Sequence, residues 1–146
     1  MAETKVTING ETDGGGAWVS WTPTFVNLSG GTLSYAKYKR IGNTINLKLA
    51  YTMTGANISG SVTFTLPVTA IAANSTATII GEVNSVDMGT AVYFGSVTQS
   101  STTVAQLRVL AAAGAYTVNT GLSATVPFTW GAGDSLEAVC TYEAAA

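Results

Sequence analysis

Apolar and polar residues alternate through much of this chain, and the alternation predicts β-strands. The clearest stretch is Thr44–Thr54, in which five apolar residues alternate with polar or small ones. Its apolar positions are Ile45, Leu47, Leu49, Tyr51 and Met53. Because successive side chains of a strand point to opposite faces, this set is expected to face the core. The pattern recurs in residues 62–66 and, near the C-terminal end, at Leu136, Ala138, Cys140 and Tyr142.

Turn-forming segments rich in Gly, Ser and Asn separate the alternating stretches. They predict about eight to ten short antiparallel strands, spaced roughly ten residues apart as in β-sandwiches. The expected fold is therefore all-β, a β-sandwich or jelly roll, with an extended N-terminal arm and no long helix. In the strand expected at residues 33–40, Leu33 and Tyr35 are predicted on one face and Tyr38 on the other.

Residues 1–17 differ from the rest of the chain, and we expect them to form an anchoring arm with a glycine linker. Val6 and Ile8 alternate with polar residues, as in a short strand, and three consecutive glycines follow at 14–16. Such a run favours a linker, and the strand-like tip is suited to pairing with the sheet edge of a neighbour. The alternative is a leader without a fixed partner. Residues 18–146 are expected to form the β-sandwich domain.

Two of the three tryptophans, Trp18 and Trp21, follow this linker. Trp18–Asn27 is expected to be a single edge strand, interrupted by Pro23, because proline cannot donate a hydrogen bond to a strand ladder. We expect the two tryptophans to lock this edge against the core or against a neighbouring copy. Trp18, Trp21 and Pro23 are thus predicted, with the strand-like tip of the arm, to serve assembly.

Charged residues make up only 10% of the chain, against about 25% in a typical soluble domain. Apolar residues make up 47%, and 23 threonines supply hydroxyl groups for solubility. This composition suits exposed β proteins, including those of viral particles. It also predicts a substantial apolar contact between copies of the chain.

The net charge of −2 favours neither a nucleic-acid partner nor a membrane surface. No apolar run approaches the roughly 20 residues of a membrane-spanning helix. Four cations nevertheless lie in a stretch without acids, at Lys37, Lys39, Arg40 and Lys48. They are interpreted either as solubilising residues of two neighbouring strands or as a patch for phosphate or glycan.

The residues offer little for catalysis. The chain has no histidine, and its one cysteine, Cys140, is expected to face the core as a structural thiol. Two carboxylate pairs, Glu82 with Asp87 and Asp134 with Glu137, are interpreted as turn and surface residues. We therefore expect no catalytic residue, no metal site and no cofactor.

Aromatic and basic side chains offer the remaining candidates for binding. Exposed Tyr and Trp side chains stack on sugar rings or make protein interfaces, and Lys binds anions. The residues proposed for contact with a ligand or with another subunit are Tyr38, Lys48, Tyr93 and Trp130.

Three segments together resemble the β-sandwich domains of tailed-phage virion proteins. The first runs from Trp18-Val-Ser-Trp-Thr-Pro-Thr24 through Tyr35 and Tyr38 to Ile41-Gly-Asn-Thr-Ile45. The second is Gly60-Ser-Val-Thr-Phe-Thr-Leu-Pro-Val68. The third begins at Trp130, continues through Gly133, Asp134 and Leu136, and ends in Thr141-Tyr-Glu143. Domains of this family occur at the C-terminal ends of tail fibre and minor tail proteins, and as free-standing head fibre or decoration proteins.

The resemblance implies a homotrimeric, non-enzymatic sandwich on a virion surface. The chain lacks a fibrous shaft and begins with Met1 and the arm, which favours a decoration or accessory protein bound through the arm to a larger capsid or tail protein. The alternative is a minor tail protein or a receptor-binding knob that contacts host-surface glycans. The chain carries no signal-peptide pattern, so synthesis is expected in the host bacterial cytoplasm and final localisation on the virion surface.

Overall fold

The computed structural model describes residues 7–8, 11–12, 16–73, 77–113 and 116–146, and in these ranges the chain is all-β. The strands are β1 (Thr7–Ile8), β2 (Glu11–Thr12), β3 (Val19–Ser20), β4 (Phe25–Leu28), β5 (Thr32–Ile41), β6 (Thr44–Thr52), β7 (Ile58–Thr65), β8 (Thr78–Asp87), β9 (Ala91–Gln99), β10 (Val104–Ala113), β11 (Tyr116–Gly121) and β12 (Ser135–Glu143). Within the described ranges there is no helix that could span a membrane.

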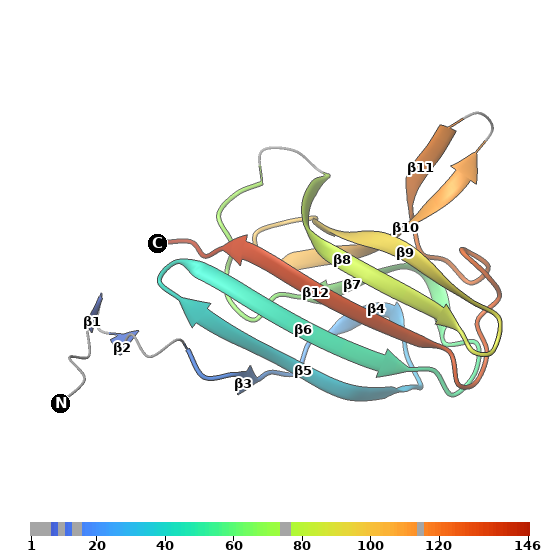
Figure 1. Ribbon diagram of the computed structural model, residues 1–146, viewed down its shortest axis with the longest axis horizontal. Helices are drawn as coiled ribbons and strands as arrows, with labels where there is room; N and C mark the ends of the chain where they lie inside the picture. Colours follow the sequence, from blue (N-terminus) through green and yellow to red (C-terminus); the bar gives the residue numbers. More distant parts are fainter. Residues whose placement is uncertain (1–6, 9–10, 13–15, 74–76, 114–115) are drawn as a thin grey trace.

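One antiparallel sheet forms the body of the molecule, in the order β3-β5-β6-β12-β8-β9-β10-β7-β4, with β11 paired to β10. The sheet curls, so that β5, β6, β12 and β8 lie in front of β10, β7 and β4 (Figure 1). The strands β1 and β2 pair with each other in a separate two-stranded sheet. The predicted all-β fold is confirmed, and its two-layered arrangement is sandwich-like.

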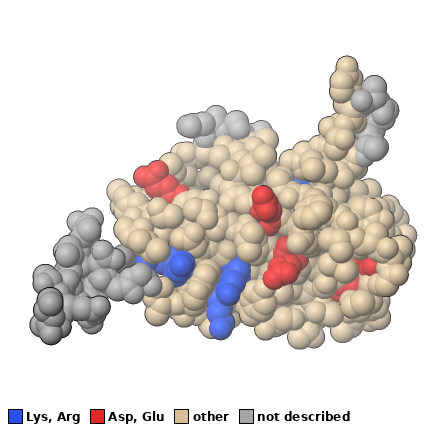
Figure 2. Space-filling model, viewed as in Figure 1, with Lys and Arg blue, Asp and Glu red and all other residues tan. Residues whose placement is uncertain are grey.

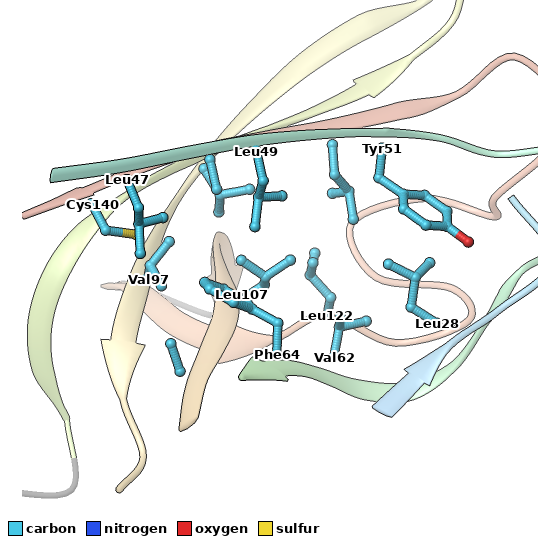
Figure 3. Packing of buried hydrophobic residues seen from close by; sticks show 14 of the residues in the cluster. Leu28, Leu47, Leu49, Tyr51, Val62, Phe64, Val97, Leu107, Leu122 and Cys140 are labelled. Atoms are coloured by element: carbon cyan, nitrogen blue, oxygen red, sulfur yellow. The ribbon is translucent and has the colours of Figure 1, made fainter. Parts of the chain in front are cut away.

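The core lies between the two layers and contains the residues that alternation predicts. The five apolar residues of the Thr44–Thr54 stretch are at most 6% exposed. Figure 3 shows Leu47, Leu49 and Tyr51 facing Leu107, Val62 and Leu122 across the core. Cys140 points into the same cluster from β12, next to Leu47, as its register with β6 requires.

A bulge in β5 changes the faces of its first residues. Leu33 pairs with Tyr51, but the next pair joins Tyr35 to Ala50, so the register shifts by one residue between them. Leu33 therefore lies on the core side, whereas Tyr35 lies on the outer side with Lys37. The prediction that Leu33 and Tyr35 share a face is wrong, because one extra residue in a strand reverses the alternation.

The expected edge strand at Trp18–Asn27 is two strands at opposite ends of the sheet. Val19 and Ser20 of β3 pair with β5, whereas β4 pairs with β7. Between them, Pro23 is buried. The segment thus crosses from one edge of the curled sheet to the other, and Pro23 lies in the crossing. An extended run with one proline does not reveal this change of layer, since both halves are extended.

The Trp21 side chain joins these two edges. Its backbone nitrogen donates to the Ala36 carbonyl oxygen at 3.1 Å, and its indole Nε1 donates to the Thr65 carbonyl oxygen at 3.3 Å. Its ring meets that of Tyr38 edge to face, with centroids 6.3 Å apart. Trp21 therefore contacts β5 through its backbone nitrogen and β7 through its indole.

We predict that Gly95→Ala lowers the free energy of unfolding by about 1–3 kcal/mol. A Cβ atom at Gly95 would collide with the backbone carbonyl oxygen of Arg108 on the neighbouring strand, and backbone cannot turn aside as a side chain can. Urea denaturation followed by circular dichroism measures the change. Gly55→Ala is the matched control, because a Cβ atom there meets nothing within 4 Å. Equal stabilities of the two variants would contradict this strand packing.

Candidate functional site

A groove runs over the outer face of β5, β6, β12 and β8, with a cavity volume of about 530 Å³. We call it the Trp18 groove. The residues that line it include Trp18, Lys39, Asn46, Lys48, Glu82 and Val139. Figure 2 views the molecule from this side and shows both basic and acidic side chains on the face. The groove lies on the face of the sheet, since β6 and β12 are each paired on both sides.

Two lysine side chains are held at the indole of Trp18. The ammonium nitrogen of Lys48 lies 4.6 Å from the ring centroid of Trp18, and that of Lys39 lies 5.2 Å from it. Lys48 is also 5.8 Å from the ring centroid of Tyr35. These cation–π contacts fix the two charges near one another without neutralising either of them. The Trp18 ring remains 42% exposed.

Strand register explains why the cations converge. Lys37 on β5 pairs directly with Lys48 on β6, and Lys39 pairs with Asn46. All three lysines therefore project from the outer face, although like charges directly opposite each other destabilise a sheet. Among the described residues, no carboxylate makes an ion pair with Lys39 or Lys48, and both side chains are half-buried. The groove thus holds two lysines without an ion pair among the described residues, together with the exposed carboxylate of Glu82.

Glu137 and Glu82 lie on the same face as this cluster, and neither makes an ion pair with Lys39 or Lys48. Tyr35 donates a hydrogen bond from its hydroxyl to Glu137 Oε1 at 2.5 Å. This bond to a carboxylate raises the pKa of Tyr35 to about 12, with burial as a smaller cause. Glu82 lines the groove but is exposed to solvent. Glu137 thus keeps its negative charge while accepting from Tyr35, and Glu82 is a solvated acid in the lining of the groove.

The carboxylates of Asp134 and Glu137 have different surroundings. The Asp134 side chain is 5% exposed and accepts hydrogen bonds from the backbone nitrogens of Gly131 at 2.6 Å and Met88 at 2.9 Å. It thereby ties the turn before β12 to the turn between β8 and β9. Glu137 lies on the outer face of β12. The interpretation of these residues as turn and surface residues is confirmed by these contacts.

Three aromatic residues proposed for ligand contact instead contribute to the interior. Trp130 is 2% exposed, its ring lies 4.3 Å from that of Phe128, and its Nε1 donates to the Ser123 carbonyl oxygen at 2.9 Å. Tyr93 is half-buried, with its ring 5.3 Å from that of Phe128. Tyr38 faces inward against Trp21. The structure thus corrects the expectation for Trp130, and of the four candidates only Lys48 lines the groove.

The predicted anchor residues fall into three groups. Val6 lies outside the described residues, and Ile8 is described only as a member of β1, which pairs with β2. Trp21 and Pro23 are in the crossing segment of the domain. Trp18 lies on the outer face, at the groove. A role of these residues in assembly stays a prediction.

The chain's cysteine has the surroundings of a structural thiol. Cys140 is 3% exposed, and burial raises the pKa of its thiol to about 12. Such a thiol is protonated at neutral pH and is a poor nucleophile. In the described part of the chain, no three His, Cys, Asp or Glu side chains come together as metal ligands.

Comparisons with protein-family models, curated proteins and solved structures find no match for this chain. The geometry of its surfaces is therefore the basis for assigning a function.

Besides the groove, the described surface carries an apolar region on β9 and β10. Val92, Phe94 and Leu110 are each more than half exposed, with Phe94 at 65%. The ladder between β9 and β10 ends at the pair Gly95–Val109, and Phe94 and Leu110 follow that pair on the outer face. We call these three residues the β9–β10 surface. The sequence alone does not identify this surface, because the residues around Phe94 do not show whether its side chain faces outward or inward.

The hairpin of β10 and β11 continues this surface away from the body of the molecule (Figure 1). Its other face carries Tyr116, which is 80% exposed, and Val118, which is 41% exposed. Leu110 pairs with Asn119, so Leu110 and the two β11 residues point to opposite faces. The projecting hairpin therefore exposes apolar side chains on both faces.

Proposed function

We propose that this chain is a non-enzymatic structural protein on the surface of a tailed-phage virion. It is a homotrimeric decoration or accessory protein, which residues 1–17 anchor to a larger capsid or tail component. It is made in the host bacterial cytoplasm and acts on the particle. The observation that carries the proposal is the pair of apolar faces on the projecting β10–β11 hairpin, together with the β9–β10 surface.

These apolar faces support contact between copies. Exposed aromatic and aliphatic residues, with few charges among them, are typical of protein interfaces. Along β9, β10 and β11 the one charged residue is Arg108, and its guanidinium donates to Gln106 Oε1 at 3.1 Å and to the Asn119 carbonyl oxygen at 2.6 Å. A projecting element with two apolar faces suits a ring of copies, in which each copy presents different surfaces to its two neighbours.

The surroundings of the chemically reactive residues support a non-enzymatic role. The Cys140 thiol is buried, the Asp134 carboxylate caps two turns, and the Glu137 carboxylate accepts from Tyr35. These three groups, out of those that the sequence offers for catalysis, therefore have a structural partner or a buried environment.

We expect Phe94→Asp combined with Leu110→Asp to convert the assembled protein into a monomer. Each carboxylate would be desolvated in an apolar contact between copies, at a cost of several kcal/mol. Sedimentation velocity measures the change, and circular dichroism checks that the fold is kept. The matched control is Ile41→Asp, which places a charge at an exposed residue of the β5–β6 turn, 43% exposed. Assembly unchanged in the double variant would contradict the proposed surface.

The location of the protein in purified particles tests the function itself. We expect the chain in particles of the phage that encodes it, and we expect deletion of residues 1–16 to abolish incorporation while the remaining domain stays folded. Particles without the protein should adsorb to cells normally but release DNA at a lower temperature. Absence from particles would contradict the proposal, and loss of adsorption would favour the receptor-binding alternative.

A further inference from the structure

We infer that the Trp18 groove binds a sugar that carries a negatively charged group, a carboxylate or a phosphate. The inference goes beyond the structural role proposed above and does not depend on where the protein resides. It rests on the juxtaposition, in a single groove, of the exposed residue Trp18 with two ammonium groups that make no ion pair among the described residues, although Glu82 also lines the groove.

The charge of the ligand follows from Lys39 and Lys48. Their ammonium nitrogens lie 5.2 Å and 4.6 Å from the Trp18 ring centroid, in a half-buried position without an ion pair among the described residues. Lys37 increases the positive potential from the position opposite Lys48. Holding like charges together in a partly desolvated groove is unfavourable, and an oxyanion placed between them relieves the repulsion.

The rest of the ligand follows from the walls of the groove. Trp18 is 42% exposed and Val139 is 50% exposed, so part of the lining is apolar. Polar groups lie beside them. Thr141 donates from Oγ1 to Asn46 Oδ1 at 3.0 Å, and the Asn46 amide nitrogen has no partner among the described residues. A sugar ring has an apolar C–H face and hydroxyl groups at its rim, and it matches such a lining. A cavity of about 530 Å³ is within the size range of small-molecule sites.

The position of the groove on the face of the sheet makes a peptide a poorer occupant. An extended peptide gains affinity by adding a strand to a free sheet edge. The groove offers no such edge, because β6 and β12 are each hydrogen-bonded on both sides. A peptide would have to lie across the face with its backbone groups unpaired.

Calorimetric titration of the full chain with matched probes tests the inference. Trigalacturonate supplies carboxylates on sugar rings, and its methyl ester supplies the same rings without charge. Glucose 6-phosphate and glucose form the corresponding phosphate pair. We expect at least one charged probe to bind about tenfold or more tightly than its neutral partner, and to shift the NMR signal of the Trp18 indole N–H but not that of the buried Trp130.

The variant Lys39→Gln with Lys48→Gln should weaken binding of the charged probe about tenfold or more, because both charges at the indole are lost. Lys37→Gln is the matched control, since Lys37 is exposed on the same face and does not line the groove, and it should change the affinity by less than about threefold. Thermal unfolding checks that all variants are folded. Equal binding of charged and neutral probes would overturn the inference, as would absence of binding at 10 mM probe. Binding of inorganic phosphate or hexaglutamate as tight as that of the charged sugars would overturn the assignment to a sugar.

Discussion

Trp130→Ala is expected to lower the free energy of unfolding by about 3–5 kcal/mol, the range for removing a large aromatic side chain from a core. The Trp130 ring is 2% exposed and lies against Phe128, whose ring also contacts Tyr93. The substitution leaves a cavity between the β12 turn and the loop that contains Phe128. It also leaves the Ser123 carbonyl oxygen without the indole donor. Urea denaturation with a linear extrapolation measures the loss.

Two control variants distinguish the effect of losing a buried ring from the effect of losing an indole. Trp130→Phe keeps most of the ring contact with Phe128 and loses the hydrogen bond, so it should cost about 1–2 kcal/mol. Trp18→Ala removes the same side chain from an exposed position and should cost less than about 1 kcal/mol. A loss for Trp130→Ala no larger than that for Trp18→Ala would contradict the packing described for Trp130.

The second large effect is a fall in stability at alkaline pH, driven first by Cys140. Burial raises the pKa of its thiol from 9.0 to about 12, and burial also raises the pKa of Tyr142 from 10.0 to about 12. Both groups must stay protonated in the folded chain, whereas the unfolded chain releases the protons at the lower values. Their contribution to stability is therefore complete below about pH 9 and is lost as the pH rises toward 12. Each group contributes a slope of about −1.4 kcal/mol per pH unit within its window.

The variant Cys140→Ala tests whether the thiol causes the loss of stability that begins near pH 9. Without the thiol, the free energy of unfolding should stay nearly constant between pH 9 and 10 and fall only above pH 10, where Tyr142 and Tyr35 begin to contribute. Urea denaturation at half-unit steps of pH measures the profile. A wild-type profile that is flat up to pH 11, or a variant with the same slope between pH 9 and 10, would contradict the buried thiol.

Much of the fold follows from local sequence. Alternation in Thr44–Thr54 and in the last strand places Leu47, Leu49 and Cys140 in the core, and the structure confirms these positions. Period-two alternation is a property of each strand alone, so it can be read without knowledge of the partners. Prediction from alternation fails where one extra residue reverses which side chains face the core, as the bulge between Leu33 and Tyr35 shows.

Long-range features of the fold could not be predicted in the same way. The segment from Trp18 to Asn27 has the composition of one strand, yet its halves pair with β5 and β7. Which edges they join depends on how the sheet curls, and that is set by contacts far along the chain. Trp130 sits among glycines typical of an exposed turn, but the position of Phe128 encloses it.

The sequence points to individual residues of the candidate site, but it does not show that they lie together. The sequence marks the cation-rich stretch that includes Lys39 and Lys48, and separately marks Trp18. Their convergence needs the pairing of β3 with β5 and of β5 with β6. The hydrogen bond between Tyr35 and Glu137, beside the lysines, joins residues 102 positions apart. No local pattern contains that information.

The mass of the purified protein in solution tests most directly whether copies of this chain assemble through their apolar faces. Sedimentation equilibrium at micromolar concentration should give three times the 14.9 kDa of a single chain. The Phe94→Asp, Leu110→Asp variant should give the mass of one chain under the same conditions. A wild-type protein that sediments as a single chain at these concentrations would contradict the account.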